Sequence, residues 1–63
     1  MKKLREIRKL KGMTQATLSA FTGVNRVSIA KYETGKTEPS LKTAEKLALA
    51  LGVTVDELIG KAE

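Results

Sequence analysis

The sequence predicts an all-α fold, a compact five-helix bundle, and two observations carry this prediction. Apolar residues recur three and four residues apart, which is the period of a helix, and no segment alternates apolar and polar residues as a strand does. Each of the five glycines follows a point at which an apolar helical pattern stops, where a left-handed residue commonly ends a helix. The predicted helices span about residues 2–11, 15–22, 26–34, 41–51 and 55–59.

Helix start signals lie between these segments. Thr14, Asn25, Ser40 and Thr54 are residue types that favour the N-cap, because their short polar side chains accept a hydrogen bond from a free backbone N–H. Glu57 follows Thr54 by three residues, so the last helix is expected to open with a capping box.

Apolar spacing predicts one core shared by all five helices. A chain of 63 residues is near the size at which a core buries only about 60% of the unfolded surface, so we expect a single domain over residues 1–63. In chain order, the residues expected to face this core are Leu4, Ile7 and Leu10, then Leu18, Val24, Ile29 and Tyr32, then Leu41, Ala44, Leu47, Ala48 and Leu51, and finally Val55, Leu58 and Ile59.

Composition excludes several functional classes. The absence of Cys and His excludes disulfides, thiolate zinc sites, Ser-His or Cys-His catalytic pairs and haem ligation. No apolar run approaches the roughly 18 residues of a membrane span, and residues 1–12 are charged where a signal peptide is apolar. We therefore expect a cytoplasmic protein that is not an enzyme, with no cofactor, no metal, no small-molecule ligand and no membrane partner.

Positive charge is concentrated in one half of the chain. Residues 1–36 contain nine Lys or Arg against two acids, a net charge of +7, whereas residues 37–63 contain three Lys against five acids, a net charge of −2. This asymmetry favours a polyanion bound on one side, because neutralising its phosphates releases counterions.

The basic half contains the most informative segment, TQATLSAFTGVNRVSIAKYETGK over residues 14–36, which is typical of two short helices joined at Gly23. This is the pattern of a helix-turn-helix DNA reader, whose second helix enters the major groove with its N-terminal residues deepest. The residues expected to face outward are Asn25, Arg26, Val27, Ser28 and Lys31.

This segment resembles the lambdoid phage repressor and Cro family. Three further segments carry the same resemblance, namely LREIRKLKGMTQ near the start, YETGKTEPSL after the second motif helix and LALALGVTVDELI near the end. The resemblance covers nearly the whole chain. It implies a five-helix bundle whose third helix enters the major groove of double-stranded DNA, usually as a homodimer on a palindromic operator.

The resemblance also implies residue roles. The base-reading positions correspond to Arg26, Val27, Ser28 and Lys31, and the phosphate-contacting positions correspond to Gln15, Asn25, Thr34, Lys36 and Thr37. Asn25 is interpreted first as a helix cap and second as a backbone contact. Arg8 and Glu33 correspond to an ion pair between the first and third helices that orients the recognition helix.

Three positions depart from the family pattern. Thr22 stands where a larger apolar residue is frequent. Ser19 stands where Ala usually allows close packing of the two motif helices, and its hydroxyl could bond back to a carbonyl. Phe21 stands where a charged residue is common, so it either folds onto a neighbouring helix or leaves an apolar spot for a partner.

The sequence therefore predicts a sequence-specific DNA-binding domain of a transcriptional regulator, more specifically a repressor. The alternative is a protein-interaction module, antitoxin-like or a scaffold, that keeps the same fold. Binding to duplex DNA discriminates between these two hypotheses.

Overall fold

The computed structural model describes residues 1–61. Within these residues the chain forms five helices and no strand, as predicted. They are α1 (Leu4–Leu10), α2 (Gln15–Thr22), α3 (Arg26–Thr34), α4 (Leu41–Leu51) and α5 (Val55–Ile59). The last four agree with the predicted ranges, whereas α1 is shorter at both ends than predicted. None of these helices combines the length and the apolar character needed to cross a lipid bilayer.

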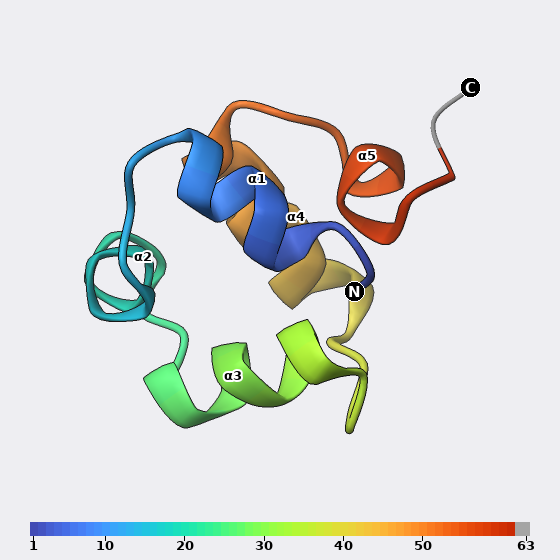
Figure 1. The fold of residues 1–63 in the computed structure, drawn as a ribbon. Helices are drawn as coiled ribbons and strands as arrows, with labels where there is room; N and C mark the ends of the chain where they lie inside the picture. The colour runs from blue at the N-terminus through green and yellow to red at the C-terminus, as the bar shows by residue number, and fades with distance from the viewer. Residues whose placement is uncertain (62–63) are drawn as a thin grey trace.

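Helix packing leaves α3 at the edge of the bundle. Helix α4 packs against α2 and α5, and α1 packs against α3 and α5. Helix α3 is held mainly by α2 and more lightly by α1, and it runs along the lower edge of the view in Figure 1. One side of α3 is therefore available to face solvent.

The predicted limits of the last four helices are confirmed by hydrogen bonds and backbone angles. The side chains of Thr14, Asn25, Ser40 and Thr54 each accept a bond from a backbone N–H two or three residues later, and the capping box of α5 is present. The four helices with these caps all end at a left-handed glycine. Helix α1 lacks a side-chain cap at Lys3, and it is the helix whose observed limits differ from the predicted range of residues 2–11.

Among residues 1–61, the core consists of nine buried apolar residues, namely Met1, Leu4, Leu18, Ile29, Ala44, Leu47, Ala48, Leu51 and Leu58. Two residues that we expected in it are exposed instead, Leu10 at 77% and Leu41 at 69%. The buried face of α1 is centred on Leu4 and Arg8, and Leu10 lies about 120° around the helix from Leu4. Leu41 is the first residue of α4, whose buried positions begin one turn later.

Met1 is a core residue that the sequence analysis missed. Its side chain is buried, and its amino group donates a 2.7 Å hydrogen bond to the backbone oxygen of Tyr32. The same amino group lies 3.4 Å from a carboxylate oxygen of Glu38. The start of the described chain is thereby attached to the last turn of α3.

Candidate nucleic-acid interface

The turn between α2 and α3 is held by two hydroxyl groups. Ser19 Oγ donates to the backbone oxygen of Val24 at 2.5 Å. Thr22 Oγ1 donates to the backbone oxygen of Leu18 at 2.8 Å and accepts from the Val24 N–H at 3.1 Å. The Ser19 hydroxyl does bond a carbonyl, but it reaches forward into the turn and not back along α2. These bonds, with Gly23 at a φ of 76°, fix the angle between the two motif helices.

Helix α3 has one fully buried apolar residue and an exposed face that includes its first two residues and Lys31. Ile29 is fully buried against the rest of the bundle. Arg26 and Lys31 are exposed, and Val27 is 61% exposed although its side chain is apolar. Ser28 is half-buried. The four predicted base-reading residues therefore include three exposed side chains on one short helix.

The predicted phosphate-contacting residues lie at both ends of α3 and at the start of α2. Asn25 Oδ1 accepts a 2.8 Å hydrogen bond from the Val27 N–H, which is the structural role expected of it. Thr34, Lys36 and Thr37 are all exposed in or beside the loop that follows α3. Gly35, at a φ of 81°, turns the chain there.

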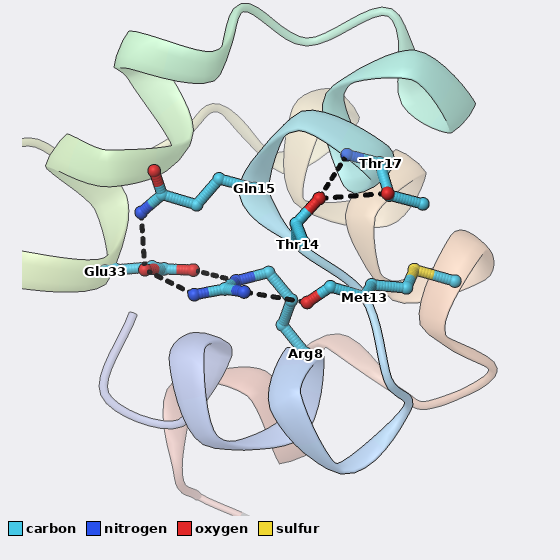
Figure 2. A network of polar contacts seen from close by, with 6 residues as sticks. All are labelled: Arg8, Met13, Thr14, Gln15, Thr17 and Glu33. Carbon is cyan, nitrogen blue, oxygen red and sulfur yellow. Dashed lines mark hydrogen bonds and ion pairs between the residues drawn. The ribbon is translucent and has the colours of Figure 1, made fainter.

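Three helices meet at the carboxylate of Glu33 in α3 (Figure 2). Arg8 Nε of α1 donates to Glu33 Oε2 at 2.6 Å, and Arg8 Nη1 also donates to the Met13 backbone oxygen at 2.8 Å. Gln15 Nε2 of α2 donates to Glu33 Oε1 at 3.0 Å. The expected ion pair between Arg8 and Glu33 is confirmed. The hydrogen bond from Gln15 to Glu33 was not predicted from the sequence.

Electrostatics at Glu33 favours its ionised form. Burial raises the pKa of the Glu33 carboxyl, whereas hydrogen bonds from Arg8 and Gln15 lower it. With the positive charges of Arg8 and Arg5, they hold that pKa below its ordinary value. The carboxylate therefore stays charged at neutral pH and keeps both of its partners.

Gln15 is half-buried and already engaged at the site. A side-chain amide has two N–H donors, so the bond to Glu33 uses one and leaves the second for another acceptor. The bond also fixes the direction of the side chain at the first residue of α2 (Figure 2).

Phe21 is exposed on α2. The first of the two alternatives for this residue, folding onto a neighbouring helix, is therefore wrong. The second alternative, an apolar spot on the surface, remains.

Comparison of the sequence with known proteins places the chain in a family. A helix-turn-helix family model matches residues 4–58. An HTH-type transcriptional regulator of Methanocaldococcus jannaschii is 41% identical over 56 residues, which are 89% of this chain and 85% of that protein. YonR, a regulator derived from the SPbeta prophage of Bacillus subtilis, is 44% identical over 57 residues, 90% of this chain and 53% of YonR.

A phage protein is also similar to the chain. The transcriptional repressor RstR of the cryptic phage CTXphi of Vibrio cholerae is 34% identical over 61 residues, 97% of this chain and 55% of RstR. The chain thus spans about half the length of YonR and RstR and most of the archaeal regulator. With the matching family model, these similarities show that the chain belongs to the helix-turn-helix family, in its phage repressor and Cro class.

Proposed function

We propose that this protein represses transcription by binding an operator in double-stranded DNA, with α3 in the major groove. Its family is one of DNA-binding transcriptional regulators and not of enzymes. The observation that carries the proposal is the division of α3, which buries Ile29 in the bundle and leaves Arg26, Val27 and Lys31 exposed.

Base reading is assigned to the exposed residues of α3, with Arg26 at its start and Lys31 farther along, and to Ser28. Arg26 is the first residue of this helix, where side chains reach deepest into the groove, and its guanidinium can bond a guanine edge through two N–H groups. The exposed Val27 side chain suits the methyl group of a thymine. Lys31 lies farther along the helix, and Ser28 is a further contributor.

Phosphate contacts are assigned to residues on either side of α3. Gln15 begins α2, where free backbone N–H groups and the positive end of the helix dipole favour an anion. Asn25 precedes α3, and Thr34, Lys36 and Thr37 follow its base-reading residues. The net charge of +7 on residues 1–36 supports binding of a polyanion on this side.

Selection from a library of random duplexes tests this function. We expect recovery of a defined sequence and an affinity for it that falls as salt concentration rises. Lys46→Ala, which removes a positive charge from an exposed position on α4, is the control and should preserve the selected sequence. Failure to bind any duplex at low salt, with tight binding to a protein instead, would establish the interaction-module alternative.

We also propose that the protein acts in the cytoplasm and binds DNA as a homodimer. Helix α3, to which base reading is assigned, has nine residues and is therefore about 14 Å long, much less than the roughly 34–36 Å between half-sites one helical turn apart. One copy therefore covers a single half-site.

The pairing segment is assigned to the chain from Thr54 onward, of which residues 62 and 63 lie outside the described residues. Sedimentation of the free protein should give a monomer, and its complex with the selected duplex should contain two copies. One copy per saturated duplex, with no symmetry in the selected sequence, would exclude this assembly.

A further inference from the structure

A surface hollow lies where α1, α2 and α3 approach one another. It is bordered by Arg8 and Lys9 of α1, Gln15 and Ala16 of α2, and Arg26 of α3. Two of these residues, Gln15 and Arg26, already belong to the proposed DNA-binding surface. Lys9 does not, because neither the motif pattern nor the family resemblance assigns it a role.

The charges around the hollow are all positive. Among the residues that border it in the described structure, three are cationic and none is acidic. Arg8 is neutralised by Glu33 at 2.6 Å. Lys9 and Arg26 form no salt bridge within residues 1–61, so the hollow retains two uncompensated positive charges.

The position of the hollow relative to α3 identifies an occupant. A helix in the major groove has a sugar-phosphate backbone on either side of it, and the other helix of a helix-turn-helix crosses that backbone. The hollow lies beside Arg26 at the start of α3, between this base-reading end and α1. When α3 lies in the major groove, the anion expected next to Lys9 is therefore a phosphate of the DNA backbone.

We propose that this hollow receives one phosphate of the DNA backbone and that Lys9 is an additional phosphate-contacting residue. The inference rests on the proposed DNA-binding function. Lys9 donates to the phosphate from the α1 side, and the remaining N–H of Gln15 donates from the α2 side. Arg8 stays bonded to Glu33 and maintains the orientation of Gln15.

Lys9→Gln and Lys11→Gln form a matched pair of variants for the test. Both remove one positive charge near the C-terminal end of α1, and both introduce a good helix-forming residue. Lys11 is exposed and does not border the hollow. Circular dichroism checks that each variant is folded before binding is measured.

Fluorescence anisotropy with the selected duplex, across a salt series, measures the contact. Lys9→Gln is expected to lower the slope of log affinity against log salt by about one unit, and affinity at 0.1 M salt by about fivefold to tenfold. The loss should be similar on matched and mismatched duplexes. Lys11→Gln should change the slope by less than about half a unit.

Duplexes with a single neutral methylphosphonate, moved along each strand, locate the phosphate. At one position the neutral substitution should weaken binding of the wild-type protein clearly more than binding of Lys9→Gln, because the variant has already lost the Lys9 contact there and keeps only that of Gln15. Equal slopes for the two variants, or the absence of such a position, would overturn the role of Lys9 while the wild-type protein still selects its operator. If the wild-type protein binds no duplex, the proposed DNA-binding function is wrong, and the proposed phosphate site is then excluded as well.

Discussion

Arg8 and Glu33 form a buried ion pair that connects α1 to the end of the recognition helix. Their side chains are only 8% and 3% exposed, and Arg8 Nε lies 2.6 Å from Glu33 Oε2. The remaining polar atoms have further partners, the Met13 backbone oxygen on one side and Gln15 on the other. No buried side-chain nitrogen or oxygen among the described residues lacks a hydrogen-bond partner.

Removing one member of this pair is expected to be costly. Arg8→Ala or Glu33→Ala leaves a buried charge without its partner, so each should lower the free energy of unfolding by about 3–5 kcal/mol. A domain of this size has roughly 3–9 kcal/mol in total, at 0.05–0.15 kcal/mol per residue. Urea unfolding of both single variants and the double variant measures the coupling, which should make the double loss much smaller than the sum.

The exposed pair Lys3–Glu6 is the control for this cycle. Its atoms are 3.5 Å apart, and its side chains are 47% and 63% exposed. Each change to Ala at this pair should cost less than about 0.5 kcal/mol. Additive losses of that size at Arg8 and Glu33 would contradict a structural role for the buried pair.

The lowered pKa of Glu33 predicts a specific loss of stability in acid. Its ionised form contributes stability in full above the unfolded pKa of about 4.3, and the contribution is lost as pH falls through the lower folded pKa. The wild-type free energy of unfolding should therefore fall between about pH 5 and pH 3 more steeply than that of Glu33→Gln.

Urea unfolding over this pH range provides the measurement, and Glu45→Gln, which removes an exposed carboxylate of α4, controls for the loss of one acid. If Glu33→Gln and the wild-type protein have parallel profiles, the Glu33 pKa is not lowered by folding.

Local signals explain why four helices were predicted accurately. Thr14, Asn25, Ser40 and Thr54 are N-cap residues whose preference depends on nearby backbone N–H groups, and such information is contained in a few adjacent residues. Helix α1 has Lys3 at its start and no side-chain cap, so its limits depend on packing.

Only those features of the site that follow from the helical period could be predicted from the sequence. Contacts between residues on different helices could not. The exposure of Arg26 and Lys31 follows from the helical period once Ile29 is assigned to the core. The bond from Gln15 to Glu33 joins residues 18 positions apart on different helices, and no local pattern encodes it. Arg8 and Glu33 lie on different helices, so helical spacing gives no information about their contact. The pair was expected only because the family resemblance implies it.

Two substitutions at Asn25 are expected to distinguish its role as a helix cap from its proposed role in DNA contact. Asn25→Ala removes the acceptor of the Val27 N–H and should lower stability by about 0.5–2 kcal/mol. Asn25→Asp keeps the cap and favours the helix dipole, so stability should be retained, but the added negative charge should weaken binding to all duplexes.

Ser40→Asp makes a corresponding change at the cap of α4, outside the proposed surface, and should leave DNA affinity nearly unchanged. Thermal unfolding and anisotropy measure the two effects separately. An Asn25→Asp protein with wild-type affinity would remove Asn25 from the phosphate-contacting residues.

Arg26 and Lys36 are both basic and exposed, but the proposed interface assigns them different roles. If Arg26 bonds a base edge, Arg26→Ala should cost about 1–3 kcal/mol of binding free energy on the preferred duplex. It should cost much less on duplexes already altered at that base pair, because the contact is absent there. Specificity is then relaxed at one position of the operator.

Lys36 follows α3 in the loop after Gly35, and there it is proposed to meet only phosphate. Lys36→Ala should weaken binding to all duplexes about equally and lower the salt slope by roughly one unit, while the preference among sequences is retained. Binding of both variants to matched and mismatched duplexes across a salt series distinguishes the two roles. Equal, sequence-independent losses would remove Arg26 from the base-reading residues, and no loss for either variant would place the DNA-binding surface elsewhere on the molecule.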